Sequence, residues 1–392
     1  MADVEDVELI YSNFFAANDN KAINSKIDDS DESIENTKKP NFNKYRQLFK
    51  VDGNNLIFKD LDISLQQNVI LPEGSTLNIK PGTTIRMGKN ISLITYGSIT
   101  ASGTKDSPIK FIPLDDDSPW GVVAMVGGDS NNIFENCFFS GGSGAYNNGK
   151  YFSGMLSAYH VNKIKISECK FTNSYKNNGG DDAVNIKNTL ANIKNSSFFS
   201  NEGDAIDVDY VTNGSSIINS TFMSNKNDGI DVSYSQFQIS GNQIKYNRDK
   251  GISIGEDSIV TLTNTNVLKN KIGIAIKDGS DVLIDESNIS KNIVGIGLYN
   301  KKEIFSSPKV RINSTIVNNN YVNCGVESTN RFGNKPPLIF TDKEIDKKGN
   351  EYRYFLKSNI KNMSKKSVIK EALGSSWKNK SIEYILFNEC NL

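Results

Sequence analysis

The sequence predicts an all-β solenoid in which every repeat forms one coil stacked on the coil before it. A short phrase recurs six times, and its first residues are 22, 24, 22, 22 and 22 positions apart, a period typical of repeat architectures. Apolar and polar residues alternate within the phrase, as in strands with one buried face. Gly, Pro and Asn punctuate the chain between these runs. The six phrases are Ala183-Val-Asn-Ile, Ala205-Ile-Asp-Val, Gly229-Ile-Asp-Val, Gly251-Ile-Ser-Ile, Gly273-Ile-Ala-Ile and Gly295-Ile-Gly-Leu.

Two strands are expected in each coil between Asn132 and Asn320. The first strand is the recurring phrase, and the second is the next run of alternating apolar residues. Shorter runs of the same kind, broken by turns, begin at Val51. The second strands are predicted at Ile193–Phe198, Ile217–Phe222, Ile239–Ile244, Leu262–Val267 and Ile284–Ile289.

Stacking turns equivalent positions of successive coils into columns. Side chains alternate along a strand, so Ile206 is expected inside the solenoid and Asp207 outside it. Ile230 and Ile252 then continue the inward aliphatic column. A row of asparagines falls after the second strands and is expected to hydrogen-bond from coil to coil, as amide ladders do in cross-β assemblies. This row is Asn201, Asn225, Asn247, Asn270 and Asn292.

The domain organisation follows from changes in composition. Residues 1–48 are polar and lack an apolar period, which predicts a disordered leader. Residues 49–325 form the solenoid. Residues 326–392 are rich in lysine, and we expect them to cap the last coil, with a basic interaction tail as the alternative.

Charge and cysteine content exclude several classes of function. Lys plus Arg and Asp plus Glu number 45 each, so no overall field attracts nucleic acid or an anionic membrane. With one histidine and no CxxC pair, a zinc site is not expected. The chain has neither an apolar stretch of about 18 residues nor a signal-peptide start, which leaves the compartment open. Cys137 and Cys169 take matching positions, as inward thiols or as a disulfide pair.

The phrase from Asn225 to Val232 resembles right-handed parallel β-helix repeat proteins of the pectin-lyase-like group, and the likeness runs roughly from Val51 to Cys324. The segment Leu71-Pro-Glu-Gly-Ser-Thr-Leu-Asn-Ile is similar to β-helix domains beside CotH-type kinase domains in bacterial surface proteins. The resemblance implies a single right-handed β-helix of three parallel sheets, at the cell surface or outside the cell. It does not imply one activity, because this fold carries lyases, hydrolases, epimerases and noncatalytic proteins.

Two outward columns are expected to bring carboxylates together. Parallel strands lie about 4.8 Å apart, so stacked Asp207 and Asp231 would repel by about 1 kcal/mol in water and about 3 kcal/mol at an effective dielectric near 20. Lys187, Arg248 or Lys250, a raised pKa, or a bound cation would relieve this cost. The columns are Asn185, Asp207, Asp231, Ser253, Ala275, Gly297 and Asp182, Asp204, Asp228, Lys250, Ile272, Val294.

Three roles are open for these aspartates. They shape the turn that enters each strand, they bind Ca²⁺, or Asp207 and Asp231 act as acid and base on a glycan. The resemblance to lyases adds Lys250 or Arg248 as a base. The phrase beginning Gly180-Asp-Asp is similar to one in polygalacturonases, but its Gly-His-Gly and Arg-Ile-Lys companions are missing. The predicted calcium ligands are Asp182, Asp204, Asp207, Asp228 and Asp231.

Aromatic residues gather in the Gly-rich insertion from Ser140 to Gly180. Tyr146, Tyr151, Tyr159 and Tyr175 beside an acidic wall suit a sugar-binding groove, and a loop packed over the solenoid is the alternative. His160 is expected in a surface or turn role.

Taken together, these patterns favour a noncatalytic module that binds a glycan or a surface protein at a bacterial envelope. The alternative is a calcium-assisted lyase or epimerase acting on uronate polymers. An intracellular scaffold is the third possibility.

Overall fold

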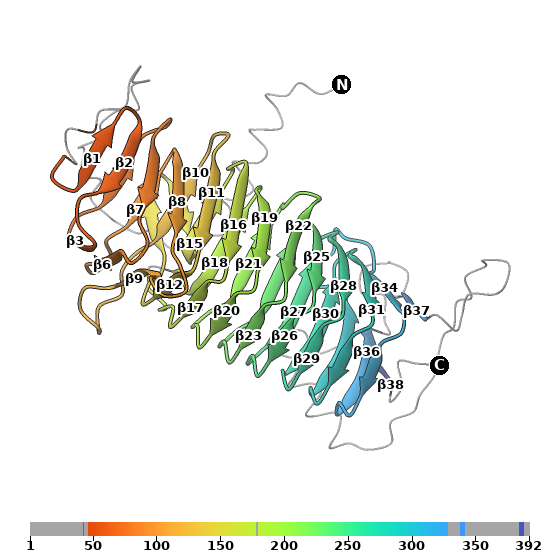
Figure 1. Ribbon diagram of the computed structural model, residues 1–392. Helices are drawn as coiled ribbons and strands as arrows, with labels where there is room; N and C mark the ends of the chain where they lie inside the picture. The colour runs from red at the N-terminus through yellow and green to blue at the C-terminus, as the bar shows by residue number, and fades with distance from the viewer. Residues whose placement is uncertain (1–41, 43–45, 178, 328–337, 342–383, 388–392) are drawn as a thin grey trace, which may run out of the picture. The chain divides into compact units, whose positions relative to one another are not determined.

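A computed structural model of the chain describes residues 42, 46–177 and 179–327 together with strands at 338–341 and 384–387. The described part is all-β, and its strands form three long sheets, named A, B and C here (Figure 1). Almost every neighbouring pair of strands is parallel, and each coil contributes one strand to each sheet. The protein is therefore a right-handed parallel β-helix, as the resemblance implied. Most of the predicted leader (all but residues 42 and 46–48) and most of the predicted cap lie outside the described residues.

Strand order in each sheet follows the chain from coil to coil. Sheet A contains β1 (Phe49–Asp52), β2 (Asn55–Phe58), β5 (Thr76–Ile79), β8 (Ser98–Ser102), β11 (Asn131–Glu135), β16 (Lys163–Ser167), β19 (Leu190–Lys194), β22 (Ser215–Ile218), β25 (Gln236–Ser240), β28 (Ile259–Thr263), β31 (Asp281–Asp285), β34 (Lys309–Ile312) and β37 (Leu338–Thr341). Sheet B contains β3 (Asp62–Leu65), β6 (Thr84–Met87), β9 (Ile109–Pro113), β12 (Cys137–Ser140), β17 (Lys170–Thr172), β20 (Ser197–Phe199), β23 (Thr221–Met223), β26 (Gln243–Lys245), β29 (Asn266–Leu268), β32 (Asn288–Ser290) and β35 (Ile316–Asn318). Sheet C contains β4 (Val69–Leu71), β7 (Leu93–Thr95), β10 (Val123–Val126), β15 (Gly154–Tyr159), β18 (Asp182–Lys187), β21 (Ile206–Asp209), β24 (Ile230–Ser233), β27 (Lys250–Gly255), β30 (Ile272–Lys277), β33 (Val294–Tyr299), β36 (Val322–Glu327) and β38 (Tyr384–Phe387).

The prediction of two strands per coil is wrong, because each predicted second strand is two strands separated by a corner. The run Ile193–Phe198 divides between β19 in sheet A and β20 in sheet B. Asn195 has a φ of 49° at this corner, and Asn219 and Asn264 have φ values of 50° and 46° at the corresponding corners. Asparagine adopts this left-handed conformation more easily than most residues. The chain therefore turns at this asparagine although the alternation of apolar residues continues through the corner, so the pattern alone does not reveal the turn.

The recurring phrase forms sheet C, and its inward column is confirmed. Ile206, Ile230 and Ile252 are register partners on adjacent strands and are all fully buried. Coils approach so closely here that a Cβ at Gly229 would lie 2.6 Å from the carbonyl oxygen of Gly251. That approach explains why glycine begins the later phrases.

Sheet B adds an inward column of phenylalanine rings. Successive ring centroids are 4.4, 4.8, 4.9 and 4.9 Å apart, and the rings are within 8° of parallel. Offset stacking of this kind adds to the gain from apolar burial. The rings belong to Phe111, Phe139, Phe171, Phe198 and Phe222.

The predicted asparagine ladder is also confirmed. Asn201 donates from Nδ2 to Oδ1 of Asn225 over 2.8 Å, and Asn225 donates likewise to Asn247 over 2.8 Å. The same amide oxygens accept the backbone N–H of the preceding asparagine, both at 3.2 Å. The ladder continues through Asn270 and Asn292. It thus satisfies buried backbone groups at one corner of several coils.

Three pairs of antiparallel strands interrupt the regular stack within the described residues. β1 pairs with β2 in the first coil, and β38 pairs with β36. A short hairpin of β13 (Ala145–Asn147) and β14 (Lys150–Phe152) projects from the Gly-rich insertion. Its Phe152 is fully buried and its ring centroid lies 5.1 Å from that of Tyr159. The hairpin is thereby fixed to the outer face of sheet C.

Cys137 and Cys169 are buried free thiols on adjacent coils, as the inward-thiol alternative expected. No helix in the part of the chain that the structure describes is long and apolar enough to cross a membrane.

Candidate functional site

The outer face of sheet C carries both acidic columns that the sequence predicts. Asn185, Asp207, Asp231 and Ser253 are register partners on β18, β21, β24 and β27. The second column lies where these strands begin. It consists of Asp182, Asp204, Asp228 and Lys250. The two columns differ in their hydrogen bonds, because the carboxylates of the second column accept backbone N–H groups of the next coil.

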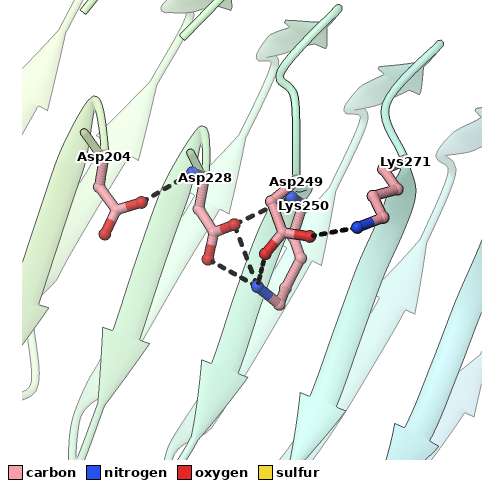
Figure 2. A network of polar contacts seen from close by, with 5 residues as sticks. All are labelled: Asp204, Asp228, Asp249, Lys250 and Lys271. Atoms are coloured by element: carbon pink, nitrogen blue, oxygen red, sulfur yellow. Dashed lines mark hydrogen bonds and ion pairs between the residues drawn. The ribbon is translucent and has the colours of Figure 1, made fainter. Parts of the chain in front are cut away.

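The buried column is a ladder of carboxylates bonded to backbone groups. Asp204 donates its backbone N–H to Oδ1 of Asp182 over 3.0 Å, and Asp228 donates likewise to Oδ1 of Asp204 over 2.7 Å. Lys250 continues the pattern with a 2.9 Å bond to Oδ1 of Asp228 (Figure 2). These four side chains are at most 8% exposed. This column was expected to face outward, and its side chains are instead buried.

Lys250 ends the ladder and neutralises it. Its ammonium lies 3.2 Å from Oδ1 of Asp228 and 2.5 Å from Oδ2 of Asp249, and Lys271 approaches Asp249 at 3.9 Å (Figure 2). Burial opposes the charge of Lys250, but these carboxylates outweigh it and raise the pKa of the ammonium above its usual range. Lys250 therefore keeps its proton, so this lysine is held as a structural cation. Arg248, the other predicted base, is exposed in the turn before β27.

Protonation of the ladder is shifted by burial. Burial and the neighbouring Asp181 raise the pKa of Asp182 to about 7. Burial also raises the pKa of Asp228 to about 6, although Lys250 opposes the shift. The pKa of Asp204 is raised well above its usual range by burial and then by Asp228 and Asp182. A part of the acidic strip is thus uncharged near neutral pH.

The outer column holds a carboxyl pair, Asp207 and Asp231. Asn185 donates from Nδ2 to Oδ2 of Asp207 over 2.6 Å, and the hydroxyl of Tyr159 donates to Oδ1 of Asn185. Burial, followed by Asp209 and other carboxylates, raises the pKa of Asp207 well above its usual range. Oδ1 of Asp231 is buried and has no hydrogen-bond partner among the described residues. Burial therefore favours the protonated form of Asp207, and Oδ1 of Asp231 is enclosed without a hydrogen bond among the described residues.

Lys277 on β30 interacts electrostatically with Asp231 and was missed from the sequence. It is 6% exposed, and it makes no ion pair with any described residue. Its stem lies over Gly255, where an added Cβ would be 3.2 Å from Lys277 Cε. Burial opposes its charge, but Asp231 and Tyr299 outweigh burial and raise the pKa of this ammonium. The sequence gives one indication of its position. Lys277 lies two residues after Ala275, so both side chains are expected on the outer face of the same strand.

Further charges border the pair on both sides. Lys187 forms a 3.0 Å ion pair with Asp209, as the columns predicted. The segment between β33 and β34 packs against coils that precede it in the chain. Lys302 contacts Glu256 at 2.7 Å, and the centroid of the Phe305 ring lies 5.8 Å from that of Tyr234. The neighbouring Lys301 has its pKa lowered by burial and by the cations of Lys277 and Lys250. The site thus combines carboxyl groups whose pKa is raised with several lysines that lie close enough to interact.

The four predicted sugar-binding tyrosines do not form one groove. Tyr159 is buried on sheet C, where it supports Asn185. Tyr146 and Tyr151 face each other across the hairpin with ring centroids 4.8 Å apart. Tyr175 lines a separate cavity of about 420 Å³ with Phe138. The insertion packs on the solenoid, as one alternative expected, and sugar binding by these tyrosines stays a prediction.

The remaining predicted residues have structural surroundings. His160 has a φ of 57° in the turn after β15, and its Nδ1 lies 3.1 Å from Nδ2 of Asn188. Among the described residues, no group of three or more His, Cys, Asp or Glu side chains is arranged to hold a metal ion. Asp182, Asp204 and Asp228 direct Oδ1 to backbone N–H groups instead. The five residues predicted as calcium ligands thus do not fit a calcium site in this arrangement, and no step below depends on a metal.

Comparison with known proteins agrees with the class that the fold defines. The family described as right handed beta helix region matches residues 210–352, which include Asp231 and Lys277. No curated protein matches the chain in sequence. The more specific likeness to domains beside CotH-type kinases stays a prediction.

Solved structures similar to this chain include enzymes that act on polysaccharides. One is the periplasmic alginate epimerase AlgG, with 14% identity, coverage of 75% of this chain and 77% of that chain, and a TM-score of 0.46. A second is the A-module of the mannuronan C-5 epimerase AlgE6 of Azotobacter vinelandii, with 13% identity, coverage of 70% and 84%, and a TM-score of 0.41. A third is the pectate lyase Pel9A, with 13% identity, coverage of 69% and 67%, and a TM-score of 0.37.

Proposed function

We propose that the outer face of sheet C binds and processes an acidic polysaccharide, by elimination or epimerisation at a uronate unit. The observation that carries this proposal is the buried ammonium of Lys277, which has no ion-pair partner among the described residues. A buried charge is costly unless an opposite charge meets it. A carboxylate of the polymer would supply that charge beside Asp207 and Asp231.

The carboxyl pair Asp207 and Asp231 supports a catalytic role, because the flanking coils stack with neutral residues at the same position. The same outward column carries Asn185 and Ser253 on the two flanking coils, and both are neutral and fully buried. Two adjacent acids at this position cost stability, and they leave Oδ1 of Asp231 without a hydrogen bond among the described residues. Local features that cost stability without a structural gain are expected at functional sites.

The geometry assigns a role to each group. Burial raises the pKa of Asp207 and so favours its protonated form, and Asn185 holds the carboxyl in place, so Asp207 can donate a proton. Asp231 would accept the proton on C5 of the uronate, while the ammonium of Lys277 stabilises the charge that develops on the sugar carboxylate. In elimination, the electron pair of the C5–H bond forms the C4–C5 double bond, the C4–O bond breaks, and the leaving oxygen takes the proton of Asp207. In epimerisation, a proton returns to C5 from the opposite face.

Two further expectations from the sequence stay as proposals. Noncatalytic binding of a glycan uses the same face and differs only in the absence of product. A location outside the cytoplasm is supported by Cys324, which is disulfide-bonded, because such bonds persist mainly in oxidising compartments.

The test is an assay on alginate, polygalacturonate and glucuronan, run once with Ca²⁺ and once with a chelator. Ultraviolet absorbance reports unsaturated ends, and incorporation of deuterium from solvent, read by NMR, reports exchange at C5. We expect activity from the wild type and a loss of about 10²- to 10⁴-fold in Asp231→Asn, the usual contribution of acid–base groups. Asp285→Asn, on sheet A of the same solenoid, is the matched control and should keep full activity.

Different outcomes point to different functions. Absence of both product and deuterium exchange with every polymer, in either condition, refutes catalysis on uronates. Retention of a polymer on the immobilised protein without turnover would then favour noncatalytic binding. If Lys277→Met binds the polymer as tightly as the wild type, the site of carboxylate recognition is wrong.

A further inference from the structure

We propose that Tyr159 is a positioning residue for the carboxyl pair: acting through Asn185, it orients Asp207 so that Oδ1 carries the proton. The inference rests on the function proposed above, because it takes Asp207 as the acid. The three residues come from three successive coils, on β15, β18 and β21. Tyr159 belongs to the Gly-rich insertion, to which the proposed reaction assigns no role.

Two hydrogen bonds join these residues, and their direction follows from the contacts. Nδ2 of Asn185 lies 2.6 Å from Oδ2 of Asp207 and 3.5 Å from the backbone oxygen of Asp207. A backbone carbonyl can only accept, so the amide group of Asn185 turns its nitrogen toward Asp207. Its oxygen then faces Tyr159 and accepts from the phenolic hydroxyl. Burial raises the pKa of Tyr159 to about 12, so this hydroxyl keeps the proton that it donates.

This direction determines which oxygen of Asp207 is protonated when the carboxyl is uncharged. Oδ2 accepts from Asn185, and in a protonated carboxyl the carbonyl oxygen is the better acceptor. The proton is therefore placed on Oδ1, which makes no hydrogen bond with a described residue. Asp207 is half-buried, and its Oδ1 is not enclosed, unlike Oδ1 of Asp231. The proton thus lies on the oxygen that a polymer on the outer face of sheet C can contact.

The surroundings hold the hydrogen-bonded chain in place. Asn185 is fully buried, and Tyr159 is 6% exposed. The ring of Tyr159 packs against Phe152 of the β13–β14 hairpin, and the ammonium of Lys187 lies 5.5 Å from the centroid of the same ring. Packing of this kind restricts the rotamers of residues that support a site. The hairpin therefore contributes to the orientation of the acid through Tyr159.

The first test follows the titration of Asp207 by carbon-13 NMR of aspartate carboxyls, with the signal assigned by its loss in Asp207→Asn. A donor to a carboxylate favours the charged form, so Asn185→Ala should raise the pKa of Asp207 further. Tyr159→Phe should raise this pKa too, because the amide loses the group that orients it. Alanine fits this column, since Ala275 occupies it on β30. Tyr246→Phe, an exposed tyrosine on another sheet, is the control and should match the wild type.

Two results of the titration would overturn the inference. A lower pKa of Asp207 in Asn185→Ala would mean that the amide is reversed and accepts a proton from the acid. An unchanged pKa in both variants would mean that the hydrogen-bonded chain does not act on Asp207.

Activity provides the second measurement. Tyr159→Phe should lower kcat about tenfold with little change in KM, a part of the contribution of a positioned acid. Its loss of activity at high pH should move to higher pH, because the acid must be protonated. Once Asn185→Ala is in place, adding Tyr159→Phe should cost nothing more. Losses that multiply would show that Tyr159 acts by another route and would overturn the inference. A wild type without turnover refutes the proposed function, whereas the titration still decides whether the chain orients Asp207.

Discussion

The substitution Asp182→Asn should make the stability of the protein less dependent on pH. Asp182 is 6% exposed, and burial, together with Asp181, raises its pKa from 3.8 to about 7. The folded state therefore binds this proton more tightly than the unfolded state does. The stability that the proton contributes is complete below pH 4 and is lost as the pH rises toward 7. Asparagine has no such proton, and its amide oxygen can still accept the backbone N–H of Asp204.

The size of the effect follows from the shift. A pKa change of about 3 units corresponds to about 4 kcal/mol, at 1.36 kcal/mol per unit. The free energy of unfolding of Asp182→Asn, minus that of the wild type, should therefore rise by about 4 kcal/mol between pH 4 and pH 8. Near pH 4 the two proteins should differ little, because the wild-type carboxyl is then protonated in the folded state and still partly protonated in the unfolded state, where its pKa is 3.8.

The assay is urea denaturation at a series of pH values, followed by far-ultraviolet circular dichroism and by tryptophan fluorescence, to which the buried Trp120 contributes. Asp106→Asn, a change of the same kind at an exposed loop residue, is the control and should give a constant difference. A constant difference for Asp182→Asn as well would refute the burial of a protonated ladder. A difference that falls with pH would show that the native state favours the charged carboxylate.

Two further substitutions test the stacking of the coils. Asn247→Ala removes the acceptor of both N–H groups of Asn225 and the donor to Asn270, and leaving buried groups without partners should cost about 3 kcal/mol, read from the same denaturation curves. Ile230→Asp places a charge in the filled interior and should unfold its region of the solenoid, which a lower melting temperature would report. Ile259→Asp makes the same change at a residue that is 54% exposed and should have little effect. An unchanged melting temperature for Ile230→Asp would contradict its inward orientation.

Periodicity made much of this architecture predictable. A spacing of 22 or 24 residues with alternating apolar positions permits only one vertical register, since a slip by one residue would turn the aliphatic column outward. The neighbours of Ile230 and Asn225, and the stacking of Asp207 on Asp231, could therefore be deduced from equivalent positions. The corner at Asn195 could not, because a strand and a bent strand share the same apolar alternation.

The candidate site could be predicted in part from the sequence and in part only from the tertiary structure. The sequence by itself determined that carboxylates stack on one face of the solenoid, because side-chain direction in a strand is a local property. Only the tertiary structure decided that Asp182, Asp204 and Asp228 are buried, that Lys250 is held by Asp228 and Asp249, and that Lys277 lies unpaired, among the described residues, beside Asp231. Burial and charge pairing depend on what other coils, the hairpin and the segment after β33 place around a residue. Those contacts join positions distant in the chain and leave no local pattern in it.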